Sequence, residues 1–548
     1  MTGEPDAPGS SLIPVPTSDL TRPSRDLVRR GLDSLLKGES RTIEFPSGFS
    51  LGTLRIYGED SLLGDWRKPY WPSAPPLRVL RARGQVTIGG GEKALLDIDH
   101  GPPDLSPLRN LTSDALWGLV STYSGPRKLT DGDMRHLASL TGLHYLSLWG
   151  WEITDAGLEC LKGMAALRSL DIVSGRITGV GLAHLGGLAS LKSLALSCRS
   201  LTDAATPFIA ECAGLEHLSL TDVQITDAGL AYLGELEGLK SLTLSAGRYF
   251  KDRPSFTDDG IAHLAGLTNL KSIALSTRIT NTGLSPISGL TGLEELSLFG
   301  LEITDAGLAL ITRLAGLKRL GLGFHEGSRI SPRIDLGHLA ALPGLEHLWL
   351  ADCDFIDARV GGLGDLVNLK SLDVDGGRRL AEAGMAPFAG MRNLERLQMR
   401  GEPFTLGPLG SLTHLETLIL IDPPITDVGL APLSRLVKLT RLHIAFHIGI
   451  ASPSFTDAGI AHLKGLTALK WLDLGGTQVT DAGLAHLSGL TALERLDLRE
   501  TPITDAGLVQ LKDLTSLRRL CLMGTKVTEA GRAFLLGLGN RDVQIAFE

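Results

Sequence analysis

A 24-residue pattern recurs along most of this chain, and a repeat of that length constrains the fold more than any local propensity does. Its clearest copy is LERLDLRETPITDAGLVQLKDLTS, which starts at Leu493. The central leucine of the LxxLxL segment can be followed through sixteen copies, and nine of the fifteen intervals are 24 residues long. An irregular earlier copy has its central leucine at Leu119. The sixteen positions are Leu146, Leu170, Leu194, Leu218, Leu242, Ile273, Leu296, Leu320, Leu348, Leu372, Leu397, Leu418, Leu442, Leu472, Leu496 and Leu520.

Each repeat has two halves with different hydrophobic periods. LxxLxL alternates, which predicts a short strand with its leucines on one face. ITDAGL then begins a helical segment, in which Thr504 is a suitable N-cap and Asp505 places an acid in the first turn. The glycine of this segment recurs, as at Gly483 and Gly507, although glycine costs about 1 kcal/mol inside a helix relative to alanine. This recurrence predicts that neighbouring repeats pack too closely there for a side chain.

A unit of this size cannot bury enough apolar surface alone, so the repeats must stack and share one interior. Strands stack about 4.8 Å apart while helices need about 9–10 Å, which makes the stack curve with its strands on the inside. We therefore predict an α/β solenoid, a curved horseshoe with parallel β-strands on the concave face and helices on the convex face.

The ITDAGL element and the LxxLxL frame resemble those of leucine-rich-repeat proteins, specifically the subtype found in bacterial repeat proteins and in F-box-associated leucine-rich-repeat proteins. The resemblance covers about residues 113–548. That family usually carries Asn or Cys eight residues after the first leucine, to satisfy backbone groups in the turn. Here the position holds Cys353 once and Thr477, Thr501 and Thr525 in the last three repeats. This departure argues against a continuous side-chain ladder at that position.

The flanks divide the chain into four segments. Residues 1–25 contain five prolines and predict a disordered tail. Residues 26–112 predict an N-terminal helix followed by a strand-rich capping region or degenerate repeats. Residues 113–530 are the leucine-rich repeats, and residues 531–548 form a C-terminal cap that ends in the strand-like segment RDVQIAFE.

The residues between the strand leucines predict the chemistry of the concave face. In the N-terminal half they are mostly small, whereas from about the eighth repeat they include Trp and Arg, the residue types that anchor protein interfaces. A solvated sheet face with internal Asp–Arg pairs is the alternative interpretation. The predicted partner-binding residues of this face are His347, Trp349, Asp373, Arg396, Arg400, Arg441, His443, Trp471, Asp473 and Arg495.

Three intervals are longer than the rest, and all three insertions follow a strand, so they should emerge on one edge of the horseshoe. Such insertions are often binding loops, although tolerated surface length explains them equally well. Their aromatic and histidine residues add Tyr249, Phe250, Phe324, His325, Phe446 and His447 to the predicted partner-binding set.

Composition narrows the classes of function. Lys+Arg 53 against Asp+Glu 61 gives a net charge of −8, which argues against nucleic-acid binding because phosphate neutralisation needs clustered cations. The five cysteines show no CxxC spacing, and neither a secretory signal nor a run of about 18 apolar residues is visible. We expect a cytoplasmic monomer that uses neither cofactor nor membrane.

Sequence signatures of chemistry are missing. Four histidines recur in GLAHL or GIAHL phrases because the repeat recurs, so no metal site is expected. There is no GxSxG or HExxH motif, and we expect no enzyme. The leading hypothesis is a bacterial-type scaffold for a protein partner. The alternatives are an F-box-type substrate-recognition subunit, or an effector resembling one, and an enzyme whose site lies near Asp97, Asp99 and His100.

Overall fold

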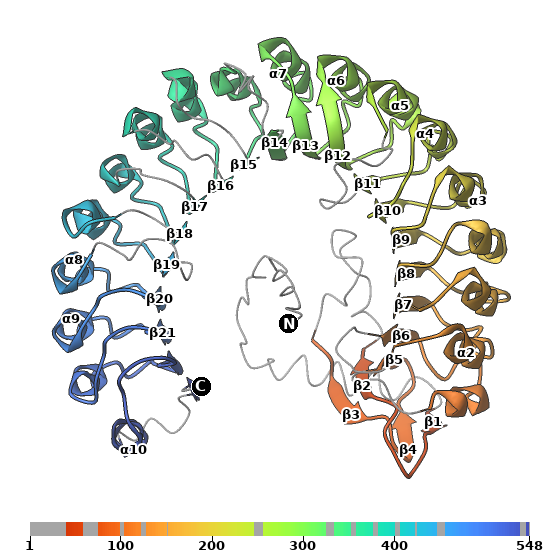
Figure 1. The fold of residues 1–548 in the computed structure, drawn as a ribbon, viewed down its shortest axis with the longest axis horizontal. Helices are drawn as coiled ribbons and strands as arrows, with labels where there is room; N and C mark the ends of the chain where they lie inside the picture. The colour runs from red at the N-terminus through yellow and green to blue at the C-terminus, as the bar shows by residue number, and fades with distance from the viewer. Residues whose placement is uncertain are drawn as a thin grey trace, which may run out of the picture.

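The computed structural model describes residues 40–58, 75–98, 104–121, 128–150, 152–245, 256–324, 334–351, 358–375, 382–400, 406–421, 425–445, 455–537 and 544–546. The predicted tail of residues 1–25 and the helix predicted after it lie outside these ranges. The described residues form a curved solenoid, with strands along its inner face and helical segments along its outer face (Figure 1). The predicted α/β horseshoe is therefore confirmed.

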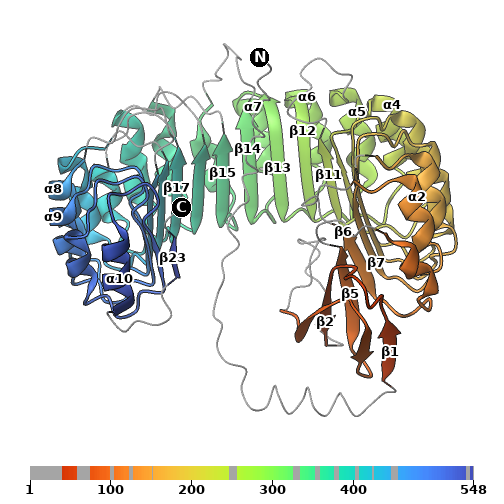
Figure 2. The same ribbon diagram turned by 60° about the horizontal axis from the view of Figure 1, so that its bottom comes forward.

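One sheet runs the length of the solenoid. Among the described residues it contains β2 (Thr53–Tyr57), β3 (Arg78–Arg81), β5 (Lys93–Ile98), β6 (Gly118–Ser121), β7 (Tyr145–Trp149), β8 (Ser169–Ser174), β9 (Ser193–Cys198), β10 (His217–Thr221), β11 (Ser241–Ser245), β12 (Ser272–Thr280), β13 (Glu295–Glu302), β14 (Arg319–Phe324), β15 (His347–Ala351), β16 (Ser371–Asp375), β17 (Arg396–Arg400), β18 (Thr417–Ile421), β19 (Arg441–Ala445), β20 (Trp471–Asp473), β21 (Arg495–Asp497), β22 (Arg519–Cys521) and β23 (Gln544–Ala546). From β5 to β23 each strand pairs in parallel with the next, as Figure 2 shows for β11–β15.

The central leucines of all sixteen predicted copies occupy one column of this sheet. Leu146 lies beside Leu170, and the pairing continues without a slip to Leu496 and Leu520. The two outlying segments extend the same column, because Leu119 pairs with Leu146 and Ile545 pairs with Leu520. The register also crosses the three long intervals intact, so the additional residues of the insertions lie outside the sheet.

Short helices alternate with the strands and cover the outer face. The α-helices are α2 (Asp131–Met134), α3 (Thr206–Ala210), α4 (Asp227–Leu233), α5 (Asp258–Ala262), α6 (Asn281–Ile287), α7 (Asp305–Ile311), α8 (Asp457–Ile460), α9 (Asp481–Leu484) and α10 (Glu529–Gly537). The 3₁₀ helices are η2 (Ser106–Asn110), η3 (Arg135–Leu137), η4 (Asp155–Leu161), η5 (Val180–Gly187), η6 (Asp203–Ala205), η7 (His263–Gly266), η8 (Leu336–Ala341), η9 (Ala358–Asp365), η10 (Glu382–Gly390), η11 (Gly407–Ser411), η12 (Val428–Arg435), η13 (Ala461–Leu463), η14 (Ala485–Leu487) and η15 (Gly507–Leu511). Because these segments are wider than a strand, the sheet curves inward.

The interior is one continuous layer of aliphatic side chains. In a typical repeat, Leu472 from the strand, Leu474 directly after it, and Leu484 and Leu487 from the helical half are all fully buried. A single apolar cluster extends through the repeats from one end of the solenoid to the other. Each repeat is therefore covered by its neighbours, as the stacking argument requires.

A side-chain contact that we call the Asp–Thr clamp joins successive helical segments. The aspartate of the TD pair in one repeat accepts hydrogen bonds from both the backbone N–H and the hydroxyl of the threonine at the corresponding TD position in the next repeat. In the last clamp, Asp505 accepts from the Thr528 N–H at 2.8 Å and from its hydroxyl at 2.6 Å. The other clamps with both bonds are Asp131–Thr154, Asp155–Thr178, Asp203–Thr226, Asp227–Thr257, Asp258–Thr280, Asp427–Thr456, Asp457–Thr480 and Asp481–Thr504.

The clamp explains the recurrent glycine of ITDAGL. A Cβ atom at Gly507 would overlap the Oδ1 of Asp481 in the preceding repeat, and one at Gly483 would overlap the Oδ1 of Asp457. The predicted close packing between repeats is thus confirmed, and the atom that demands it is the clamp carboxylate. The prediction of Thr504 as the N-cap is wrong, because η15 begins at Gly507 and its N-cap is Ala506, so the bond from the Ala506 N–H to the Thr504 hydroxyl at 3.3 Å lies in the turn before the helix.

The turn position that held Asn or Cys in the family resemblance makes only local contacts in the last three repeats. The hydroxyls of Thr477, Thr501 and Thr525 donate to the carbonyl oxygens three residues earlier, at 2.8, 2.6 and 2.7 Å. These bonds stay within one repeat, so the ladder that connects repeats is the Asp–Thr clamp on the helical side.

The N-terminal end of the sheet is antiparallel. β2 lies between β3 and β5 and runs antiparallel to both, while β1 (Arg41–Glu44) and β4 (Gln85–Ile88) form a separate antiparallel pair. Asp97 of β5 is buried and pairs with the Arg55 guanidinium at 2.6 Å. Asp99 and His100, the other two residues of the enzyme alternative, lie outside the described residues. No helix in the described part of the chain has the length and apolar character that a membrane crossing requires.

Candidate binding surface

Side chains on either side of the central leucine project from the concave sheet and form rows that cross successive strands. We call the residue before the central leucine the first row and the residue after it the second row. From β15 to β22 the first row is His347, Ser371, Arg396, Thr417, Arg441, Trp471, Arg495 and Arg519. The second row is Trp349, Asp373, Gln398, Ile419, His443, Asp473, Asp497 and Cys521. Nine predicted partner-binding residues thus come together in two adjacent rows, and Arg400 ends β17 beside them.

The same rows hold mostly small side chains from β9 to β12, where His217 on β10 is the exception. β9 presents Ser193 and Ala195, and β11 presents Ser241 and Thr243. The chemical character of the concave face therefore changes between the two halves while the leucine frame stays constant.

Trp349 packs across its neighbours on the sheet. Its indole lies over β14, where Gly321 and Gly323 leave the surface without side chains, and it meets the Phe299 ring at a centroid distance of 4.9 Å. The side chain is only partly exposed as a result. Sequence alternation places Trp349 on the concave face, but the two glycines that make room for it belong to the preceding repeat.

Asp373 lies in the second row, where the charges around it do not offset the cost of burying its carboxylate. Burial raises the pKa of its carboxyl to about 6, although the positive charge of Arg396 acts to lower that pKa. The Arg396 guanidinium instead donates to the Gln398 side-chain oxygen at 3.1 Å. Arg400 pairs with Asp375 at 3.5 Å, so this section contains the Asp–Arg pairing that the alternative interpretation expected.

Trp471 lies between two arginines of the first row. The guanidinium carbon of Arg441 on β19 is 4.3 Å from the indole centroid, and that of Arg495 on β21 is 5.4 Å from it. Both contacts have the geometry of cation–π interactions. The pKa of Arg441 is lowered by burial and by the charges of Arg396 and Arg495.

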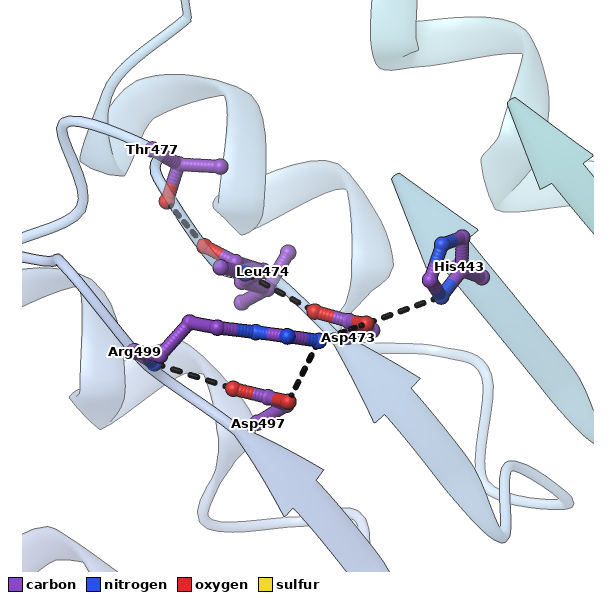
Figure 3. A network of polar contacts seen from close by, with 7 residues as sticks. His443, Asp473, Leu474, Thr477, Asp497 and Arg499 are labelled. Atoms are coloured by element: carbon purple, nitrogen blue, oxygen red, sulfur yellow. Dashed lines mark hydrogen bonds and ion pairs between the residues drawn. The ribbon is translucent and has the colours of Figure 1, made fainter. Parts of the chain in front are cut away.

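A polar network crosses the second row next to Trp471 (Figure 3). Asp473 is buried and accepts hydrogen bonds from His443 Nδ1 at 2.8 Å, the Gly475 N–H at 2.9 Å and Arg499 Nη2 at 3.3 Å. Arg499 also pairs with Asp497 at 2.9 Å. Burial alone would raise the pKa of Asp473, but the bonds and charges of His443, Gly475 and Arg499 outweigh it and lower that pKa.

This network has no activated nucleophile. The nearest thiol, Cys521, has a raised pKa because of burial and because of the Asp497 carboxylate, so it stays protonated. Burial also raises the pKa of Cys160 and Cys198 to about 12. No group of three or more His, Cys, Asp or Glu side chains within the described ranges has the arrangement of a metal site.

Of the six insertion residues in the predicted partner-binding set, the structure describes Phe324. Tyr249, Phe250, His325, Phe446 and His447 lie outside the described residues. Phe324 belongs to the core, since β14 extends to it and pairs it with Leu301 beyond a register shift.

Sequence reasoning missed several polar and aromatic residues of the N-terminal concave face. Asp171 is buried in the second row, where it accepts from the Ser147 hydroxyl at 2.9 Å, and burial raises its pKa to about 6. Trp117 stacks with His144 and Tyr145 at centroid distances of 6.0 and 6.2 Å. Strand alternation could have found Asp171, because it sits one residue after a central leucine.

The repeat geometry now identifies the fold. Each repeat contributes one parallel strand to the concave sheet and one helical segment to the convex side, with its central leucine in a shared column. This is a leucine-rich-repeat fold. No protein-family model and no curated protein matches the sequence.

Three solved structures illustrate the likeness of fold. An internalin from Listeria monocytogenes is 24% identical, with 62% of this chain and 82% of that chain covered and a TM-score of 0.41. A leucine-rich-repeat protein of Leptospira interrogans is 18% identical, with coverages of 66% and 92% and a TM-score of 0.43. TLR13, solved in complex with ssRNA13, is 19% identical, with coverages of 83% and 64% and a TM-score of 0.39. At these identities, the likeness concerns the fold alone.

Proposed function

We propose that this protein is a non-catalytic scaffold that binds a protein partner on the C-terminal half of its concave face. The main support is the contrast between the two halves of one sheet. The leucine frame is the same from β9 to β22, yet the two rows change from mostly Ser, Ala and Thr in β9–β12, apart from His217, to Trp, Arg, His and Asp from β15 onward. Since the frame itself needs no Trp or Arg at these positions, the change points to recognition.

Part of this surface is preorganised for binding. Trp471 is held between Arg441 and Arg495, so its side chain loses little conformational freedom when a partner covers it. Tryptophan and arginine are also the residue types in which interface binding energy concentrates. The His443–Asp473–Arg499 network supports the neighbouring strands and leaves the first row as the main contact surface.

The F-box-type alternative receives no support from the N-terminal segment. That alternative needs a small helical domain ahead of the repeats, whereas residues 41–98 contribute the strands β1–β5 in their described part. A net charge of −8 also favours a protein over a nucleic acid as the partner.

The test is affinity capture of the full-length protein from its native host, with the recovered partner quantified. Trp471→Ala should reduce recovery of a specific partner by about tenfold or more, as expected for an interface anchor. Trp349→Ala should also reduce it, provided that circular dichroism shows an intact fold. Trp149→Ala is the matched control, because Trp149 is 44% exposed and lies on β7 in the other half of the sheet. Equal recovery with all three variants would remove the proposed site.

A further inference from the structure

We infer that the first row from β17 to β22 binds an extended, acidic segment of the partner polypeptide. This inference rests on the proposed function and specifies the chemistry that the surface recognises. The residues concerned, which we call the arginine row, are Arg396, Arg441, Trp471, Arg495 and Arg519.

The guanidiniums of the arginine row are not engaged in ion pairs with the carboxylates described around them. Within the described residues, none of its four arginines forms an ion pair with a carboxylate. The other arginines of the concave face around it are paired, Arg319 with Glu295, Arg400 with Asp375, and Arg499 with Asp473 and Asp497. The row is thus a set of guanidiniums that a partner's carboxylates can complete with bidentate hydrogen bonds.

The structure also holds these like charges close together. Arg441 is partly buried between Arg396 and Arg495, and the two neighbouring charges together with burial lower its pKa. The Trp471 ring holds the Arg441 and Arg495 side chains beside it. An anion that binds here relieves the repulsion without having to order the side chains first.

The spacing of the row suits an extended peptide. Arg396, Arg441 and Arg495 are each two strands apart, which corresponds to about 9.6 Å. In an extended chain of the polyproline-II type, which has three residues per turn, every third side chain lies on the same side and about 9.3 Å further along. A partner peptide that lies across the strands and has an acidic residue at every third position can therefore place one carboxylate beside each of these arginines.

Two features favour a polypeptide over a nucleic acid. The indole of Trp471 has Arg441 on one neighbouring strand and Arg495 on the other, so neither face is open for base stacking. The second row places Asp473 and Asp497 directly beside the arginine row, which disfavours a broad polyanion. A narrow acidic segment avoids both obstacles.

The binding test uses three fluorescein-labelled probes and fluorescence anisotropy on the full-length protein. The first is a 15-residue peptide with Glu at every third position and Gly and Ser between. The second has Gln in place of Glu, and the third is a single-stranded oligouridylate of equal charge. The Glu peptide should bind at least tenfold more tightly than either of the others, and more weakly as salt concentration rises.

Charge reversal then assigns the site. Arg441→Glu and Arg495→Glu should each weaken binding of the Glu peptide by about tenfold or more. Arg519→Glu tests the row at an exposed position where folding is not at stake, and it should weaken binding in the same direction. Arg313→Glu is the matched control, since Arg313 is exposed just beyond α7 on the helical side.

Failure of this inference is distinguishable from failure of the proposed function. If the oligouridylate binds more tightly than the Glu peptide, or if the three reversals leave Glu-peptide binding unchanged, the acidic-segment inference is overturned. If capture of a host partner still depends on Trp471, the proposed scaffold function stands, and the surface recognises its partner by a different chemistry. Loss of that dependence would overturn the scaffold function itself.

Discussion

The carboxylate of Asp481 accepts two hydrogen bonds from Thr504 in the next repeat, one from the backbone N–H at 2.8 Å and one from the hydroxyl at 2.6 Å. Because both donors belong to a different helical segment, this clamp connects repeats that otherwise meet through apolar packing and the strand ladder. The clamp should therefore contribute measurably to stability.

Asp481→Ala should lower the free energy of unfolding by about 1–3 kcal/mol, because it removes a charged acceptor from two donors. Asp481→Asn should cost less. The chain already contains this arrangement at Asn281, whose side chain accepts from the Thr304 N–H at 3.1 Å and donates to its hydroxyl at 2.9 Å. Urea denaturation followed by circular dichroism measures both, and equal stability of the alanine variant and the wild type would contradict the clamp's role.

Gly507→Ala should destabilise the protein by about 1–3 kcal/mol, although alanine is the better helix former. The added Cβ would overlap the Oδ1 of Asp481. Combining Gly507→Ala with Asp481→Ala should therefore cost less than the sum of the two single changes. Gly489→Ala serves as the control, since no atom lies within 4 Å of a Cβ there. Additive costs in the double variant would show that the clash lies elsewhere.

Asp171→Asn should stabilise the protein at neutral pH. Burial raises the pKa of Asp171 to about 6, so the folded state holds its proton more tightly than the unfolded state does. The wild type is then most stable below about pH 4 and loses stability as the pH rises through about 6, by up to about 3 kcal/mol. The asparagine variant lacks this loss. Urea denaturation from pH 4 to pH 8 should show two stability curves that coincide near pH 4, diverge between pH 4 and pH 6, and stay separated by a constant amount at higher pH.

Asp473→Asn should have the opposite effect at neutral pH. Its partners His443, Gly475 and Arg499 lower the pKa of Asp473, so its ionised form stabilises the fold above about pH 4. The variant should lose about 1–3 kcal/mol at pH 7, and the deficit should shrink as the pH falls below 4. The same denaturation series checks this. A deficit that stays constant with pH would indicate a steric cause rather than the lost charge.

The leucine frame and its curvature could be predicted from sequence because both follow from a strict period. The Asp–Thr clamp could not. Thr504 and Asp505 are adjacent in sequence, so a cap within one helix explains both residues, and nothing local indicates that Asp505 reaches Thr528, 23 residues later.

The candidate surface was predictable to the extent that strand alternation assigns residues to the concave face. Lateral packing was not, because it depends on neighbours in the adjacent strands. Trp349 lies over two glycines of the preceding strand, and Phe324 turns into the core where β14 continues past a register shift. Asp473 gains His443 from the strand before it and Arg499 from the repeat after it.

The Asp–Thr clamps are unevenly distributed along the horseshoe. Among the described residues they are formed from Asp131 to Thr304, with a gap at Gly179, and again from Asp427 to Thr528, and Asp305 accepts one bond of this kind from the Asp335 N–H at 2.8 Å. Between these stretches, Ile356 and Ala381 stand where the clamp threonine occurs, and Leu406 stands where its acid occurs. Because each clamp ties one helical segment to the next on the convex side, where opening the horseshoe would bring the segments together and closing it would spread them, the clamped repeats should hold their share of the curvature more firmly than apolar packing alone would.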